Sequence, residues 1–223
     1  LTLPILIFSG LPSSIANGTN RVGLLIQSIF GTAGYHSKGI YTHPFSIYLG
    51  LSSLLGSLIG AQIAIDVNPD VFNKILSMVM LTMVLIMLIR KKTFENSFPE
   101  RTSGKYLIFS LLAFFFIGIY GGFINAGIGF IIIFFLNQVN RLNLVKTNAT
   151  KVSLVLIYSS GALIIFALNN AVNWKLGLML ALGSSIGSWW ASRWSVNKGE
   201  GTFRLILAIA VSLVAVKLWF FKI

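Results

Sequence analysis

The chain has 223 residues, of which 56% are hydrophobic and only 10% are charged. About 25% of the residues of a soluble domain are charged, and a disordered chain has low hydrophobicity, so this composition excludes both classes. The formal net charge is +12, from 17 Lys and Arg against 5 Asp and Glu, an excess that would indicate nucleic-acid binding in a soluble protein.

Long runs without Asp, Glu, Lys or Arg divide the chain into predicted membrane segments. A helix needs about 20 largely apolar residues to cross a hydrocarbon core about 30 Å thick, and most runs approach that length. The runs do not alternate apolar and polar residues, which disfavours a β-barrel. We therefore predict an all-α, multi-pass integral membrane protein that contacts lipid and not nucleic acid. The runs are 1–20, 22–37, 39–65, 75–89, 106–140, 152–174, 176–192 and 205–216.

The first polar patch is Asn17-Gly18-Thr19-Asn20-Arg21, which we expect to open a helix over 17–35. A helix N-terminus presents unpaired N–H groups and a partial positive charge, and Arg21 adds a planar fork of donors. This combination favours a small oxyanion as ligand. The alternative is that these residues only cap a helix at the membrane surface, with a snorkelling cation.

Two features in the next part of the chain have ordinary structural interpretations. His36 and His43 flank a short loop without a carboxylate, and the chain has no cysteine, so we predict neither a metal site nor any cofactor. Gly56 and Gly60 form a small-xxx-small pair, as Gly183 and Gly187 do later, and we interpret both pairs as helix-packing positions.

A basic linker over 91–105 separates a first transmembrane unit (1–90) from a second (106–223). Together with Arg90, the linker forms the strongest basic cluster, which places this side in the cytoplasm. Alternating spans then put 12 of the 17 cations on that side, so most of the positive charge is explained by topology.

In the second unit, the run 106–140 is too long for one span. Its glycines predict a helix to about Tyr120, a break, and a short helix over 128–138, with Asn125 at the break either contacting substrate or allowing close helix packing.

Three patterns recur in the same order in the two units. Asn17-Gly18-Thr19 returns as Asn148-Ala149-Thr150 at an offset of 131, Gly56–Gly60 as Gly183–Gly187 at 127, and Phe72 with Ile75 and Leu76 as Phe203 with Ile206 and Leu207 at 131. We predict two homologous helical repeats in inverted orientation with glycine-broken helices, a transporter plan that binds substrate near the midplane. The first helix of the first repeat is expected to be missing, because the offset places its start roughly 25 residues before Leu1. The alternative is a native start at the short first segment.

The second repeat carries a matching polar patch, Thr147, Asn148, Thr150 and Lys151, which we expect to open its own helix. The chain lacks a P-loop, a nucleophile elbow and any acid inside a predicted span, so we predict no enzyme activity and no ATP binding. Transport would then use a coupling ion or a partner ATPase.

The stretch 1–27, with Leu-Thr-Leu-Pro, Gly-Leu-Pro and Ala-Asn-Gly-Thr-Asn-Arg-Val, resembles the sulfite exporter TauE/SafE family of membrane transporters. So do 118–133, with Gly-x-Tyr-Gly-Gly-Phe-x-x-Ala-Gly-x-Gly-Phe, 143–158, and 180–204 with its Gly-Ser-x-x-Gly and Lys-Gly-Glu. The chain departs from the family in lacking its first helix and the glycine-rich segment before Leu-Thr-Leu-Pro. The resemblance implies a permease of the bacterial plasma (inner) membrane for small sulfur or organic oxyanions.

The sequence therefore favours a secondary transporter for a small anion such as sulfite, a sulfonate or a related organic oxyanion. A membrane assembly or scaffold subunit without transport is the alternative; it predicts no polar cavity between the repeats. The expected substrate-binding residues are Asn17, Thr19, Asn20, Arg21, Asn125, Asn148, Thr150 and Lys151.

Overall fold

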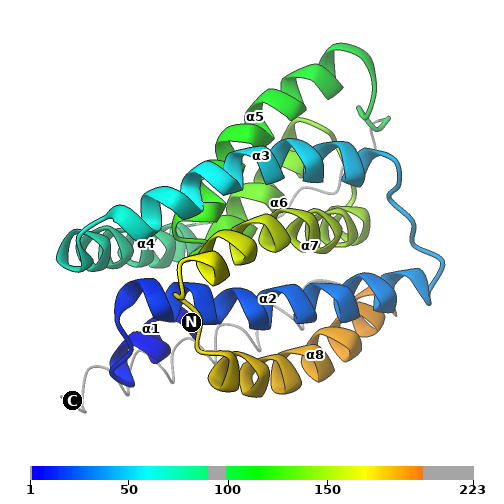
Figure 1. The fold of residues 1–223 in the computed structure, drawn as a ribbon. Coiled ribbons are helices and arrows are strands. Elements are labelled where there is room, and N and C mark those ends of the chain that lie inside the picture. Colours follow the sequence, from blue (N-terminus) through cyan, green and yellow to red (C-terminus); the bar gives the residue numbers. More distant parts are fainter. Residues whose placement is uncertain (1, 90–98, 198–223) are drawn as a thin grey trace.

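The computed structural model describes residues 2–89 and 99–197, and within them it contains eight helices and no strand (Figure 1). The all-α prediction is therefore confirmed for these residues, whereas the predicted segment around Phe203, Ile206 and Leu207 lies outside them. The helices are α1 (Thr2–Phe8), α2 (Ser13–His36), α3 (Phe45–Asp66), α4 (Pro69–Ile89), α5 (Gly104–Phe123), α6 (Ile128–Gln138), α7 (Leu144–Leu168) and α8 (Trp174–Asn197).

Among the described helices, α3, α5 and α7 are long and apolar enough to cross a membrane. Large apolar side chains cover their outer surfaces: Leu55, Leu112 and Ile164 are 59%, 61% and 56% exposed. An exposed apolar surface of this extent is unfavourable in water and favourable against lipid. These surfaces agree with the multi-pass membrane protein predicted from the composition.

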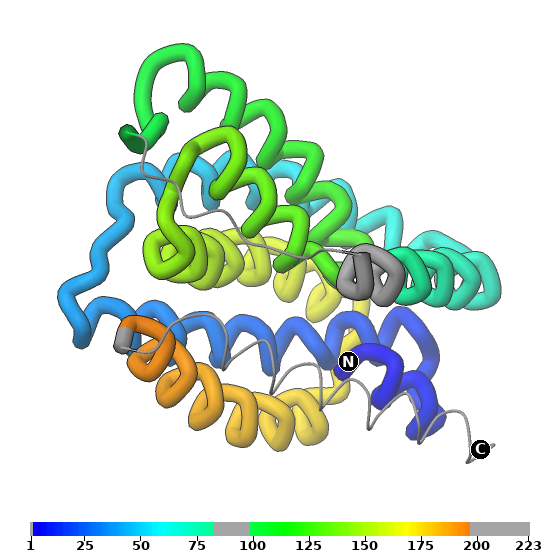
Figure 2. Tube along the Cα trace, turned by 180° about the vertical axis from the view of Figure 1, so that it is seen from behind, coloured from blue at the N-terminus to red at the C-terminus, as the bar shows by residue number. Residues whose placement is uncertain are grey.

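The long helices pack around α7. Helix α2 runs along α8, α3 runs along α5, and α7 contacts both α2 and α3. Figures 1 and 2 show α7 between the α2–α8 pair and the α3–α5 pair from both sides. Arg101 and Asn140 join the start of α5 to the α6–α7 connection, because the backbone N–H of Arg101 donates to Asn140 O and Asn140 Nδ2 donates to Arg101 O, both at 2.9 Å.

Glycines allow α3 and α5 to approach closely. A Cβ added at Gly56 would lie 2.0 Å from Phe115 O, and one at Gly60 would lie 1.9 Å from Ile119 O. The packing role predicted for these two glycines is therefore confirmed. For Gly183 and Gly187 it is wrong within the part of the chain that the structure describes, where an added Cβ would meet nothing within 4 Å.

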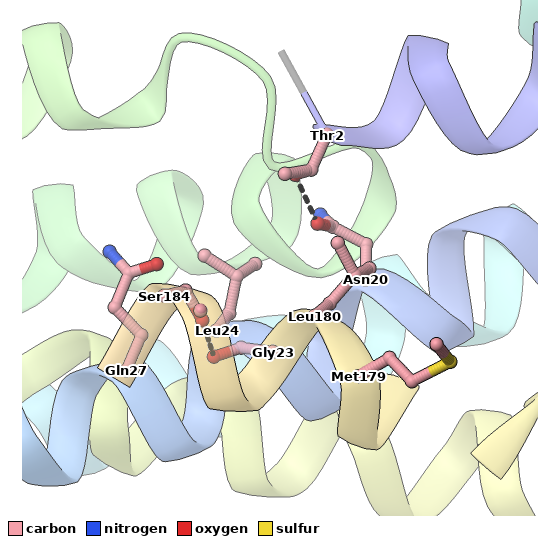
Figure 3. A pocket seen from close by; sticks show the side chains of 9 residues that line it. Thr2, Asn20, Gly23, Leu24, Gln27, Met179, Leu180 and Ser184 are labelled. Atoms are coloured by element: carbon pink, nitrogen blue, oxygen red, sulfur yellow. Dashed lines mark hydrogen bonds between the residues drawn. The ribbon is translucent and has the colours of Figure 1, made fainter. Parts of the chain in front are cut away.

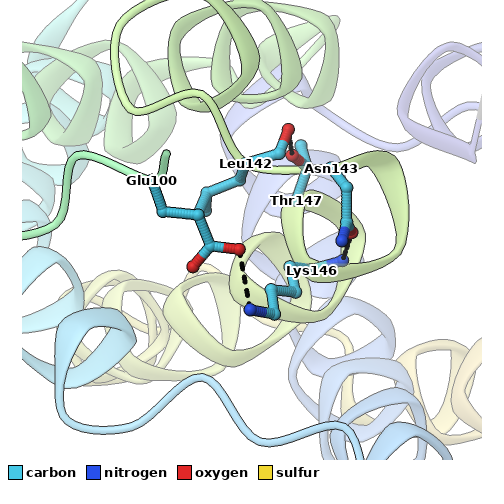
Figure 4. A network of polar contacts seen from close by, with 5 residues as sticks. All are labelled: Glu100, Leu142, Asn143, Lys146 and Thr147. Carbon is cyan, nitrogen blue, oxygen red and sulfur yellow. Dashed lines mark hydrogen bonds and ion pairs between the residues drawn. The ribbon is translucent and has the colours of Figure 1, made fainter. Parts of the chain in front are cut away.

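The two polar patches do not open their helices, contrary to the prediction. Helix α2 begins at Ser13, after Pro12 at the N-cap, which places Asn17 in the second turn. Helix α7 begins at Leu144, and its cap is Asn143, whose Oδ1 accepts from the Lys146 N–H at 2.9 Å (Figure 4). Lys146 Nζ also pairs with Glu100 at 2.7 Å. The prediction that Asn17–Arg21 and Thr147–Lys151 open their helices, and the alternative that they cap them, are therefore wrong, because these are interior helical residues.

Candidate functional site

The break between α5 and α6 is the centre of the candidate site. Helix α5 continues to Phe123, three residues past the predicted end at Tyr120, and α6 begins at Ile128 as predicted. Within the break, Asn125 has φ 55° and Gly127 has φ 71°, both in the left-handed region. Glycine enters this region freely, and asparagine does so more readily than most residues. The chain can therefore reverse here within four residues.

Two buried side chains of α2 hold the end of α5. Arg21 Nη2 donates to Gly122 O and Asn17 Nδ2 donates to Phe123 O, each at 2.7 Å. These carbonyls belong to the last turn of α5, where no helical N–H follows to bond them. A cation at a helix C-terminus also interacts favourably with the helix dipole. Arg21 and Asn17 thus cap α5 from a different helix.

Arg21 remains an incompletely satisfied buried cation. Its side chain is 0% exposed, and its Nε and Nη1 atoms have no hydrogen-bond partner among the described residues. Nη2 also contacts Asn17 Oδ1 at 3.3 Å, and the guanidinium carbon lies 5.8 Å from the centre of the Phe166 ring. The described carboxylates do not neutralise it, since Asp66 and Asp70 are exposed and Glu100 pairs with Lys146.

A buried charge is costly unless it is paired, and each unsatisfied donor of a charged group adds to that cost. The α5 carbonyls offset part of it. The two remaining donors, Nε and Nη1, lie on different edges of the guanidinium plane, and each is suited to an oxygen of a carboxylate, sulfite or sulfonate group.

Two tyrosine hydroxyls, one from α7 and one from α5, bond residues of the break. The hydroxyl of Tyr158, a buried residue of α7, donates to Asn125 Oδ1 at 2.8 Å. The Tyr120 hydroxyl donates to Ala126 O. The sequence analysis did not select either tyrosine. Tyr158 follows Lys151 by seven residues, about two turns of one helix face, and this spacing could have identified it.

Asn148 and Lys151 form a second polar group, beside the start of α6. Lys151 Nζ donates to Asn148 Oδ1 at 3.1 Å, and Asn148 Nδ2 donates to Leu144 O at 3.1 Å. A Cβ added at Gly129 would lie 3.9 Å from Lys151 Cδ, so the lysine side chain passes the first turn of α6. That turn presents unpaired N–H groups and the positive end of the helix dipole, and the lysine adds a positive charge. This group also favours an anion.

The other predicted residues do not join these two groups through hydrogen bonds. Thr19 Oγ1 accepts from the Asn173 N–H at 2.9 Å, and Asn20 Oδ1 accepts from the Thr2 hydroxyl. Thr150 is buried, and its hydroxyl has no partner among the described residues. Of the predicted set, the structure therefore brings Asn17, Arg21 and Asn125 together at the break and pairs Asn148 with Lys151.

Substitutions at Asn125 test the geometry of the break. Asn125→Ala should lower the free energy of unfolding by about 1.5–3 kcal/mol. The variant loses the hydrogen bond with Tyr158, and alanine lacks the short polar side chain that lets asparagine adopt the left-handed region. Asn125→Gly should cost less, since only the hydrogen bond is lost. Thermal unfolding in detergent measures both. Equal destabilisation by the two variants would contradict the role of the left-handed conformation.

Comparison with known proteins shows which family the chain resembles over nearly its whole length. The family model for the sulfite exporter TauE/SafE matches residues 1–218. A "Probable membrane transporter protein" of Haemophilus influenzae is 24% identical over 218 residues, covering 98% of this chain and 85% of the relative. "Probable membrane transporter protein ORF9" of a Sinorhizobium species is 26% identical over 220 residues, with 98% and 83% covered. "Probable membrane transporter protein YfcA" of Escherichia coli K12 is 28% identical over 134 residues, with 60% and 49% covered. No solved structure matches.

Proposed function

We propose that this chain, which belongs to the sulfite exporter TauE/SafE family, is a secondary transporter for a small anion such as sulfite, a sulfonate or a related organic oxyanion. The chain is a multi-pass membrane transporter and not an enzyme. The anionic substrate is our inference from the site. The observation that carries it is Arg21, a fully buried cation with two donors that have no partner in the described residues.

Both polar groups contribute to binding such an anion. Arg21 supplies charge and two free donors behind the α5 carbonyls, and Asn17 orients it. Lys151 supplies a second charge beside the start of α6, and Asn148 positions it. Asn125 links the two groups, because it lies in the segment that joins α5 to α6. The remaining members of the proposed substrate-binding set are Thr19, Asn20 and Thr150.

We further propose two inverted repeats, 1–90 and 106–223, joined by a cytoplasmic linker over 91–105 in the plasma (inner) membrane. The helix contacts support this arrangement. In the proposed repeats α7 is the counterpart of α2, and α8 is the counterpart of α3. The contact of α2 with α8 therefore matches the contact of α7 with α3, as a two-fold axis between the repeats requires. The short helices support it too. Helix α1 contacts α2 at Asn20, and α6 contacts α7 at Lys151, which corresponds to Asn20 at the offset of 131.

Uptake by proteoliposomes tests the proposal at Lys151. Initial uptake of ³⁵S-sulfite should fall about tenfold or more in Lys151→Gln, because a hydrogen bond to a charged group contributes about 1.5–3 kcal/mol. Lys105→Gln is the matched control, since Lys105 is exposed at the start of α5 and the linker retains its other cations. Wild-type uptake by an Arg21→Ala, Lys151→Ala double variant would refute the residue assignment.

A further inference from the structure

A cavity of about 250 Å³ lies between α2 and α8 (Figure 3). Its polar and glycine lining comes from three helices: Thr2 of α1, Asn20, Gly23 and Gln27 of α2, and Gly183 and Ser184 of α8. The apolar side chains of Leu24, Met179 and Leu180 complete the lining. It contains no charged side chain. Arg21, although next to Asn20 in the chain, bonds in a different direction, toward the end of α5. The cavity is therefore separate from both cationic groups.

Two amide side chains of the lining have unused hydrogen-bonding capacity. Asn20 Oδ1 accepts from the Thr2 hydroxyl, which leaves the N–H donors of that amide available. Gln27 follows seven residues later, about two turns along the same face of α2. Neither amide atom of Gln27 bonds to another described residue. Ser184 Oγ lies 3.5 Å from Gly23 O, a long and weak contact.

The burial of these amides makes their free capacity significant. Asn20 is 6% exposed and Gln27 is half-buried, both within helix α2. A polar group without a partner away from bulk water is costly, so it must face protein, trapped water or a solute. The cavity has room for more than one occupant, because a water molecule takes up about 30 Å³ in the liquid.

We propose that this cavity is a second binding position for the transported anion, in which the amide N–H groups of Asn20 and Gln27 hold a partly hydrated oxyanion without a cationic side chain. This inference rests on the proposed function. An uncharged position binds an anion more weakly than Arg21 or Lys151 does. Transport needs such positions, because a solute held too firmly at every step is not released.

The absence of cysteine from the chain makes the cavity directly testable. Gln27→Cys and Gly183→Cys each place one thiol in the lining. Gly187→Cys is the matched control, since Gly187 lies one turn further along α8 with equally open space but does not line the cavity. A charged methanethiosulfonate reagent should label positions 27 and 183 at least about tenfold faster than 187, because the reactive thiolate forms where water reaches the sulfur. Methanesulfonate, but not equal chloride, should slow labelling at 27 and 183.

A second measurement separates this inference from the proposed function. Gly183→Leu should fill the cavity and lower ³⁵S-sulfite uptake, whereas Gly187→Leu should leave uptake near the wild-type rate. If wild-type protein takes up no anion, the proposed function fails. If wild-type protein transports but labelling is equal at 183 and 187, or methanesulfonate does not slow it, only the cavity proposal is overturned. Normal uptake by Gly183→Leu would overturn it as well.

Discussion

Arg21→Met is expected to abolish anion uptake while leaving the protein folded. The variant removes two free donors of a charged group, each of which would contribute about 1.5–3 kcal/mol to holding an oxyanion. Since 1.4 kcal/mol corresponds to a factor of ten, uptake should fall by about 100-fold or more. Stability should change by no more than about 2 kcal/mol. Methionine leaves Gly122 O without its partner, but it also removes an uncompensated buried charge, and the two effects oppose each other.

The measurement pairs ³⁵S-sulfite uptake with thermal unfolding in detergent. Arg101→Met is the control, because Arg101 lies just before α5 with its guanidinium over the Tyr106 ring, 4.4 Å from the ring centre. Arg21→Lys should retain part of the uptake, since it keeps the charge and loses the planar arrangement of donors. Normal uptake by Arg21→Met, or an equal loss in Arg101→Met, would contradict an anion-binding role for Arg21.

Gly60→Ala is expected to destabilise the protein severely. The added Cβ would lie 1.9 Å from Ile119 O and 2.8 Å from Phe123 N, both backbone atoms of α5. Overpacking costs typically 1–3 kcal/mol, and we expect about 3 kcal/mol or more here because backbone cannot rotate away as a side chain can. Separating α3 from α5 would also move Phe123, the acceptor of Asn17, so uptake should fall with stability.

The proposed repeat supplies the control for this variant. By the proposed repeat, Gly187 of α8 is the counterpart of Gly60, and an added Cβ there meets nothing within 4 Å among the described residues. Gly187→Ala should be neutral or stabilising by up to about 1 kcal/mol, because alanine favours a helix over glycine. Thermal unfolding and the monodisperse fraction in detergent compare the two variants. Comparable losses in both would show that close packing at α3–α5 is not the cause.

The overall class and the helix break could be predicted because they depend on local composition. Apolar runs predict membrane helices wherever they fold, and the glycines between Gly118 and Gly129 mark an interruption in any context. The starts of α2 and α7 were predicted wrongly because Asn17 and Asn148 have the residue types of caps. The Asn17 side chain instead bonds a carbonyl 106 residues away, and no local pattern indicates such a contact.

Dependence on contacts with distant parts of the chain also explains the different environments of the two glycine pairs. Gly56–Gly60 and Gly183–Gly187 share a sequence pattern, but only at the first pair would an added Cβ clash with a neighbouring helix among the described residues. The roles of Tyr158 and Phe166 also depend on packing, because α7 brings them to the break only through its contacts with α2 and α3.

Small-anion transport is tested most directly with purified wild-type protein in proteoliposomes. We expect time-dependent uptake of ³⁵S-sulfite down an imposed gradient, above the leak of protein-free liposomes. Unlabelled methanesulfonate should compete with this uptake, and an uncharged sulfone of similar size should not. Uptake no faster than the leak for sulfite and for sulfonates, with no stabilisation of the protein by either, would contradict the proposed function and favour a membrane scaffold.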